Sequence, residues 1–202
     1  MLEDLLSLNP QETLLVVIDI QKDFLESQIG FTFFDAGSDS KDMQSMVSNR
    51  LMPFIEYSLD NKAHVVYFKA EYPQGKFSKP YDKLCSSEPG TDFYLIDELG
   101  RFNQVDTFVK REHDPFSNPK LQQYIEEKNI KYFIVTGVTL TSCIDSAVNS
   151  ALLIPDLVVI VPEDCVSYRK GREKDAQTVL NYYKLPEKIR IKVLNSGHVR
   201  YG

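Results

Sequence analysis

The segment "VTGVTLTSCIDSAVNSA", residues 135–151, is the most informative part of the sequence about the fold, because it joins a strand pattern to a helix pattern through a short polar loop. Apolar residues precede the loop, and Cys143 lies where the helix pattern begins. A strand that passes directly into a helix is typical of α/β proteins. The helix pattern has one apolar face, formed by Ile144, Ala147, Val148, Ala151 and Leu152.

Other short apolar runs predict further strands of the same sheet. They are nearly continuous, which is typical of parallel strands covered on both faces. The runs are Thr13–Ile18, His64–Phe68, Tyr132–Val138 and Leu157–Val161, with weaker ones at Val105–Val109 and Ile189–Leu194. Helical patterns alternate with them at Ser45–Leu59, Asn118–Lys128 and Gly171–Tyr183. We therefore predict a single domain over residues 1–202, a three-layer α/β/α sandwich around a mostly parallel, Rossmann-like sheet of about six strands.

Composition narrows the class of protein. The 202 residues are 43% hydrophobic and 26% charged, and the net charge of −6 argues against a nucleic-acid partner. No apolar run approaches the roughly 18 to 20 residues of a membrane span, so we expect no membrane partner. The first ten residues do not resemble a signal peptide. The three cysteines form no CxxC pair, so we expect a cytoplasmic protein in which Cys85 and Cys165 are structural.

Two long loop regions are rich in aromatic residues. The first spans about residues 26–42 and the second about residues 71–95. Aromatic loops beside a parallel sheet are candidate pocket walls, although packing as a small extra core or as a subunit contact explains them equally well. The aromatic residues are Phe31, Phe33 and Phe34 in the first loop and Tyr72, Phe77, Tyr81 and Phe93 in the second.

Three residues that could carry chemistry follow or close predicted strands. They are Asp19 after "LLVVI", Lys110 after "VDTFV", and Cys143 at the start of a helix. Because the carboxyl ends of parallel strands share one edge of the sheet, we expect these side chains to lie together. Taken singly, the aspartate has an ordinary capping explanation, the lysine a solvated one and the cysteine a structural one. Together they form a set that suits covalent hydrolysis.

The chemistry of that set is straightforward. A thiolate is the reactive form of cysteine, and both a helix N-terminus and an ammonium stabilise it, so we expect a low pKa for Cys143. The carboxylate of Asp19 can accept the thiol proton and later return it to a leaving amine. Neither a cofactor nor a metal is required.

At this point the chain resembles the isochorismatase-like cysteine hydrolases, over about residues 13–194. "VVIDIQKDFL" (16–25) is similar to the family's Asp-x-Gln-x-Asp-Phe stretch, which contains the general base. "VKREHDPFSNPKL" (109–121) is similar to the lysine segment, and "VTGVTLTSCIDSAVNSA" to the nucleophile segment. "EDCVSY" (163–168) is a weaker match. The resemblance implies Asp19 as base, Lys110 as stabiliser and Cys143 as nucleophile.

The resemblance also implies finer features. The peptide between Val138 and Thr139 would be cis, and the backbone N–H groups of Thr139 and Cys143 would form an oxyanion hole. The family often assembles as homodimers or homotetramers. The expected reaction is hydrolysis of an amide, carbamoyl or ureido group in a small-molecule substrate.

Residues that the sequence lacks or contains indicate which branch of the family the chain resembles. Nicotinamidases carry an Asp-x-His metal motif after the second strand, whereas "FKAEYPQGKF" here has no histidine. The three histidines are far apart in the sequence, so we predict no metal and no nicotinamidase activity. True isochorismatases lack the cysteine, and Cys143 argues against that branch.

The residues around the expected pocket differ from the family pattern. Leu140, Asp114-Pro115 and Glu112 depart from the family pattern near the expected pocket mouth, so no particular substrate can be transferred. His113 and Asp114 are adjacent, and we do not expect them to form a pair, since neighbours on a strand point to opposite faces. Arg169 or Arg172 could bind a carboxylate, although the run "RKGREKD" (169–175) is more simply interpreted as a solvated loop and helix start. Our candidates for substrate contact are Phe24, Tyr72, Phe116, Leu140 and Tyr168, each of which could instead be core.

Two alternatives to an enzyme of this kind remain. A divergent member of the family could keep the fold as a small-molecule-binding or interaction module without hydrolase activity. The complete Asp19, Lys110 and Cys143 set argues against that, because binding alone does not need all three. A nucleotide- or flavin-binding domain would need a glycine-rich first turn, and "DIQKDFL" contains no glycine.

Overall fold

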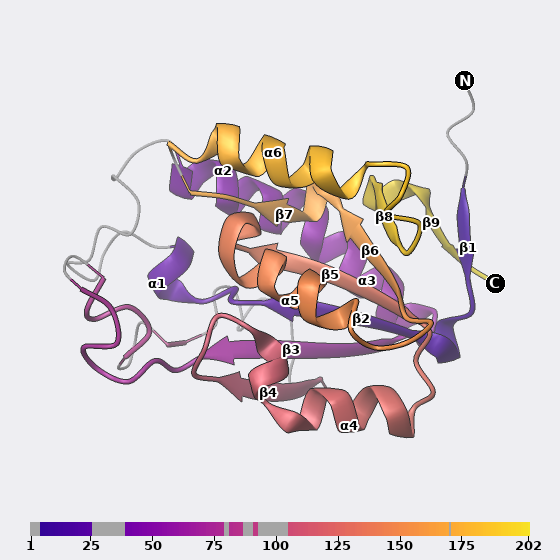
Figure 1. The fold of residues 1–202 in the computed structure, drawn as a ribbon, viewed down its shortest axis with the longest axis horizontal. Coiled ribbons are helices and arrows are strands. Elements are labelled where there is room, and N and C mark those ends of the chain that lie inside the picture. The colour runs from indigo at the N-terminus through magenta and orange to yellow at the C-terminus, as the bar shows by residue number, and fades with distance from the viewer. Residues whose placement is uncertain (1–4, 26–38, 79–80, 87–90, 93–104, 170) are drawn as a thin grey trace.

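The computed structural model describes residues 5–25, 39–78, 81–86, 91–92, 105–169 and 171–202 (Figure 1). The four aromatic residues Phe31, Phe33, Phe34 and Phe93 of the two long loops lie outside these residues.

A parallel sheet forms the centre of the molecule. The strand order is β4-β3-β2-β5-β6-β8, and the short β7 pairs with β5. Every pair in the sheet is parallel. This confirms the predicted α/β fold, while β7 was not predicted. The strands are β2 (Thr13–Ile18), β3 (His64–Ala70), β4 (Asp106–Lys110), β5 (Tyr132–Val138), β6 (Val158–Pro162), β7 (Val166–Ser167) and β8 (Ile191–Leu194).

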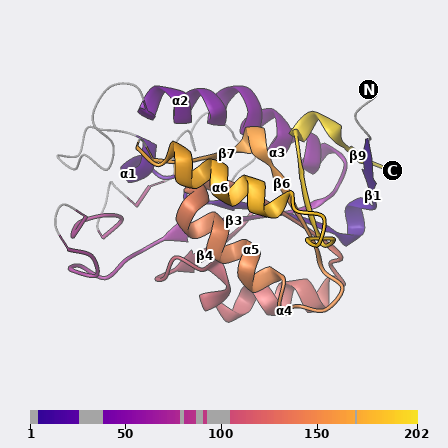
Figure 2. The same ribbon diagram turned by 45° about the horizontal axis from the view of Figure 1, so that its top comes forward.

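Helices cover both faces of this sheet, which gives the predicted three layers (Figures 1 and 2). Two helical stretches include five-residue π-helical segments: Val47–Leu51 joins α2 to α3, and Leu140–Ile144 precedes α5. The first stretch already begins at Asp39, so the predicted loop over 26–42 was wrong at its end. The helices are α1 (Lys22–Leu25), α2 (Asp39–Met46), α3 (Met52–Asp60), α4 (Pro119–Glu127), α5 (Asp145–Ala151) and α6 (Glu173–Tyr183).

Alternate residues of each central strand enter different hydrophobic cores, because side chains alternate between the faces of a sheet. On β2, Leu15 and Val17 pack in the core that includes residues of the α2–α3 stretch. Leu14, Val16 and Ile18 pack in the other core, which includes residues of α4, α5 and α6. All six β2 residues are therefore buried, which explains the continuous apolar run in the sequence.

A second, two-stranded parallel sheet was not predicted. It joins β1 (Leu6–Leu8) to β9 (Val199–Tyr201). It lies at the end of the molecule away from the carboxyl ends of β2 and β3 (Figure 1). Both strands have only three residues, which is too short for a periodic pattern to identify.

Candidate active site

The three residues expected at the strand ends meet in the structure. The Lys110 Nζ lies 2.9 Å from Asp19 Oδ2 and 3.4 Å from Cys143 Sγ. Asp19, Lys110 and Cys143 are 0%, 1% and 3% exposed, respectively. An acid, a base and a thiol therefore share one buried position beyond the carboxyl ends of β2, β4 and β5.

The backbone after β2 aims the Asp19 side chain. Asp19 has a left-handed φ of 58°, which aspartate tolerates better than most residues. Its N–H donates to the Phe68 carbonyl at 3.0 Å, which ties this turn to β3. The carboxylate pairs with the Lys110 ammonium, and the Cys143 thiol is a side-chain hydrogen-bond partner. The carboxylate is thus placed to accept a proton.

Lys110 is held by more than its two charged neighbours. It is the last residue of β4, and its Nζ also donates to the Tyr72 hydroxyl and to the Glu112 carbonyl, each at 3.1 Å. A buried ammonium is stable only when it is paired and hydrogen-bonded, and here its protons have several acceptors.

Cys143 is placed by the turn that leaves β5. Gly137 pairs with Ile18 of β2 and has a φ of +108°, and a Cβ there would lie 2.1 Å from the Ile18 carbonyl oxygen. Only glycine fits such an approach. The Val138–Thr139 peptide that follows is cis, as the family resemblance implies. Cys143 then sits within the helical segment Leu140–Ile144.

The charges and burial at the site correct our expectation of a low pKa for Cys143. Burial raises the pKa of the Cys143 thiol to about 11, and the negative charge of Asp19 adds to the rise, whereas Lys110 opposes it. Burial also raises the pKa of Asp19 despite the nearby ammonium. For Lys110, burial lowers the pKa, but Asp19 and Cys143 together outweigh burial and raise it. The resting thiol is therefore protonated, and the low pKa that we expected from the helix start and the ammonium is wrong.

Two residues of the "DIQKDFL" stretch organise the loops around this cluster, a role that we did not assign from the sequence. The Gln21 amide donates to the carbonyls of Ala70 and Thr91 at 2.9 and 2.8 Å, and it accepts from the Ala70 N–H at 2.7 Å. The Asp23 carboxylate accepts from the Cys85 N–H at 2.7 Å. The available signal was the Asp-x-Gln-x-Asp-Phe stretch, in which both residues fall.

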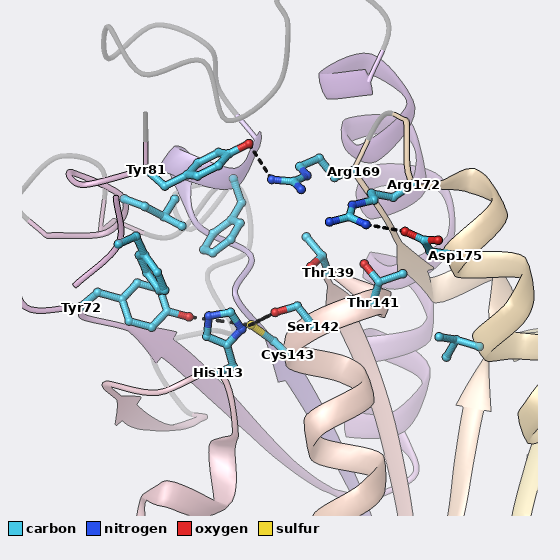
Figure 3. A pocket seen from close by; sticks show the side chains of 14 residues that line it. Tyr72, Tyr81, His113, Thr139, Thr141, Ser142, Cys143, Arg169, Arg172 and Asp175 are labelled. Atoms are coloured by element: carbon cyan, nitrogen blue, oxygen red, sulfur yellow. Dashed lines mark hydrogen bonds and ion pairs between the residues drawn. The ribbon is translucent and has the colours of Figure 1, made fainter. Parts of the chain in front are cut away.

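A cavity of about 470 Å³ opens beside Cys143. Aromatic residues of the 71–86 region form part of its wall, as the aromatic loops suggested. In Figure 3, the labelled Tyr72 and His113 lie across from Arg169 and Arg172, with Ser142 and Cys143 between them. The lining residues are Phe24, Tyr72, Phe77, Tyr81, Leu84, His113, Thr139, Thr141, Ser142, Cys143, Arg169, Arg172, Asp175 and Val179.

The five candidates for substrate contact divide into two groups. Phe24 and Tyr72 line the cavity. The other three lie elsewhere: Phe116 packs against Phe133, with ring centroids 5.6 Å apart, Leu140 is fully buried in the core of α4–α6, and Tyr168 is 38% exposed outside the lining. Leu140 begins the helical turn that carries Cys143, and its aliphatic side chain packs inward from there.

His113 is the polar wall residue that sequence reasoning undervalued. Its Nδ1 is hydrogen-bonded to the Ser142 hydroxyl. Its neighbour Asp114 faces other partners, accepting from Phe116 N–H at 2.9 Å and Ser150 Oγ at 2.6 Å, so the two adjacent residues form no pair. His113 reaches the cavity because the folded chain brings it beside Ser142, which is 29 residues away in the sequence. No local sequence pattern predicts such a contact.

The opposite wall carries two guanidinium groups. Arg169 donates to the Tyr81 hydroxyl at 2.6 Å, and Arg172 pairs with Asp175 at 2.5 Å. The side chains of Arg172 and Asp175 are about half exposed, at 50% and 53%. Arg169, Arg172 and Asp175 therefore line the cavity. The helix start that we expected in this run is present, since α6 begins at Glu173.

The described part of the chain contains no cluster of three His, Cys, Asp or Glu side chains suited to a metal ion. Within the same residues, no helix is both long and apolar enough to cross a membrane.

Comparison with known proteins identifies the family. The isochorismatase domain model matches residues 13–184, which is most of the chain, so the chain belongs to the isochorismatase family. The predicted membership of the isochorismatase-like family is confirmed.

Solved structures share the fold at low sequence identity. A cysteine hydrolase from Pseudomonas syringae pv. phaseolicola has a TM-score of 0.73 at 16% identity, covering 98% of this chain and 95% of its own. A pyrazinamidase/nicotinamidase from Streptococcus mutans has a TM-score of 0.71 at 20% identity, covering 90% and 99%. An N-carbamoylsarcosine amidase from Thermoplasma acidophilum has a TM-score of 0.69 at 18% identity, covering 92% and 96%.

Proposed function

We propose that the protein hydrolyses a C–N bond in a small-molecule amide, carbamoyl or ureido compound, through a covalent intermediate on Cys143. One observation carries the proposal: a single buried ammonium, Lys110, contacts both the Asp19 carboxylate at 2.9 Å and the sulfur of Cys143 at 3.4 Å, and Cys143 lines a cavity. A purely structural cluster gains nothing from facing an open cavity.

In the first half-reaction, the Cys143 sulfur attacks the substrate carbonyl and its proton passes to Asp19. The raised pKa values of both groups mean that the cluster retains this proton until a substrate arrives. The backbone N–H groups of Thr139 and Cys143 would stabilise the oxyanion. The C–N bond then breaks, the proton on Asp19 goes to the departing nitrogen, and a thioester remains on Cys143.

The second half-reaction regenerates the enzyme. Asp19, again a carboxylate, takes a proton from water, and the resulting hydroxide attacks the thioester. The C–S bond breaks, and the proton returns from Asp19 to the thiolate. Lys110 keeps its charge throughout and offsets the negative charge that moves between oxygen and sulfur.

The cavity supports a substrate with an anionic substituent. Aromatic residues form one wall, and Arg169 and Arg172 border the opposite side. A guanidinium binds a carboxylate through two parallel hydrogen bonds. We therefore propose that the substrate presents its carbonyl to Cys143 and a carboxylate to these arginines.

We also propose that the protein is cytoplasmic, that it forms a homodimer or homotetramer, and that it acts without a cofactor.

A binding module without hydrolase activity is the second candidate, and the high thiol pKa is the observation that favours it. The two candidates differ in what Cys143 does with a bound amide. A hydrolase turns it over, whereas a binding module retains it unchanged.

The test is a screen for ammonia or amine release over carboxylate-bearing amides, carbamoyl amino acids and ureides. The wild-type protein is compared with Cys143→Ser and with Cys165→Ser, which alters a buried thiol outside the cavity lining. Release by the wild type and by Cys165→Ser, with none from Cys143→Ser, would support the hydrolase. Binding of a screened compound without release would support the second candidate.

A further inference from the structure

The pair formed by His113 and Ser142 joins two distant parts of the chain at the cavity wall. His113 follows β4, and Ser142 immediately precedes Cys143. His113 Nδ1 is hydrogen-bonded to Ser142 Oγ, which lies 4.0 Å from Cys143 Sγ. The imidazole is thus held by the residue that precedes Cys143 in the chain. The reaction proposed above does not use this imidazole.

Aromatic contacts restrict the ring further. The His113 ring meets Phe77 edge-on, with centroids 5.4 Å apart, and lies tilted beside Tyr72 at 6.1 Å. One ring nitrogen is engaged by Ser142, so Nε2 is the nitrogen that remains for a ligand in the cavity that His113 lines (Figure 3).

The charges around His113 set its protonation. Burial lowers its pKa, the ammonium groups of Lys110 and Lys76 lower it further, and the carboxylates of Asp19 and Glu112 only partly oppose them. The imidazole is therefore neutral at pH 7, with a single ring proton. If the Ser142 hydroxyl donates to Nδ1, that proton is on Nε2.

We infer that His113 is a substrate-binding residue whose Nε2–H donates to an oxygen acceptor on the non-reacting part of the substrate, with its tautomer fixed by Ser142. The ligand class is an amide, carbamoyl or ureido compound with a carbonyl or carboxylate oxygen beyond the scissile bond. This inference rests on the proposed function and adds to it a residue of the cavity wall that selects among substrates.

Alkylation of Cys143 provides a test that needs no known substrate. Iodoacetamide carries a carbonyl oxygen, whereas methyl iodide alkylates the same sulfur without any acceptor. The ratio of the two rates at Cys143, measured by peptide mass spectrometry, reports recognition of the oxygen. We expect His113→Phe, which keeps a ring against Phe77, to lower the ratio about three- to tenfold, as for loss of one hydrogen bond.

Two further variants sharpen this result. His113→Gln can place an amide donor near the Nε2 position and should restore part of the ratio. His198→Phe, outside the cavity lining, should leave the ratio unchanged. An unchanged ratio in His113→Phe would overturn the inference. If both alkylation rates fell equally, the ratio would be unchanged, and the fall would indicate a general change in access to the sulfur.

The tautomer is a second, spectroscopic readout. The chain has three histidines, so ¹⁵N-labelled histidine in the full-length protein gives few signals to assign. We expect the His113 signals to report Nε2–H in the wild type and a mixture of tautomers in Ser142→Ala. An Nδ1–H tautomer in the wild type would overturn the inference.

The proposed function can fail separately from this inference. Absence of ammonia or amine release by the wild type would count against the hydrolase, whatever the alkylation ratios are. Release by the wild type, combined with an unchanged ratio in His113→Phe, would leave the hydrolase standing and remove His113 from substrate binding.

Discussion

The floor and the rim of the cavity differ in how they are built. We call the buried cluster of Asp19, Lys110 and Cys143 the floor: Cys143 lines the cavity, and the other two contact each other and the sulfur beneath it. Three parallel strands bring the cluster together. The rim is made by residues outside those strands, including His113 and the half-exposed pair of Arg172 and Asp175. The sheet therefore fixes the positions of the reacting groups, whereas the connections between strands and helices supply the side chains that would contact the rest of a substrate.

Removal of the base at the floor should cause the greatest loss of activity. Asp19→Asn keeps the size of the side chain but cannot take the thiol proton, so we expect turnover to fall about 10³-fold, within the usual range for general bases. The measurement is kcat/KM for any substrate found in the release screen. Asp175→Asn makes the same chemical change at the rim and should retain turnover within about tenfold.

The backbone of the floor is tested by Gly137→Ala. A Cβ would lie 2.1 Å from the Ile18 carbonyl oxygen, at a φ of +108°, so we expect the free energy of unfolding to fall by about 3 kcal/mol or more. Urea denaturation provides the measurement. Gly75→Ala is the matched control, since Gly75 has a φ of +76° with no atom within 4 Å of the added Cβ. Its cost should be about 1 kcal/mol, and equal losses would contradict the close approach at Gly137.

The pH dependence of Cys143 alkylation separates reactivity from catalysis at the floor. Because the thiol pKa is about 11, the iodoacetamide rate should rise about tenfold per pH unit from pH 7 to 10. Asp19→Asn removes a negative charge, lowers that pKa and should speed alkylation at pH 8 while turnover is lost. Lys110→Met should slow it. A plateau below pH 8 in the wild type would show a pre-formed thiolate instead.

The smallest expected effect lies at the rim. Arg172→Gln should reduce alkylation of Cys143 by iodoacetate about threefold relative to iodoacetamide, because an exposed guanidinium contributes little to binding an anion. Asp175→Asn should change this ratio in the opposite direction, since it releases Arg172 from its partner at 2.5 Å. Arg50→Gln, which lies outside the cavity lining, is the control. Equal ratios in all variants would remove the anionic substituent from the proposal.

The same division explains what the sequence could predict. Continuous apolar runs identified the main strands, and strand ends pointed to Asp19, Lys110 and Cys143, because parallel topology brings such ends together. The position of Leu140 was beyond reach, since a residue three positions before the cysteine can face either the cavity or the core. His113 was undervalued for a related reason: its partner, Ser142, is 29 residues away.

Electrostatics were also beyond the sequence. A cysteine beside a lysine at a helix start suggested a stabilised thiolate, but the net effect depends on burial and on the distance to Asp19. In the folded protein, desolvation dominates and raises the thiol pKa. The sequence thus identified the reacting groups but not their resting protonation states.

The most direct test of the central proposal is to look for the thioester itself. The wild-type protein would be mixed with a compound that releases ammonia or an amine, quenched in acid within milliseconds to seconds, and analysed by intact-protein and peptide mass spectrometry. The expected result is an added mass equal to the acyl part of the substrate, located on Cys143 and absent from Cys143→Ser. Turnover in Cys143→Ser at the wild-type rate, or an adduct at another residue, would contradict a mechanism centred on this cysteine.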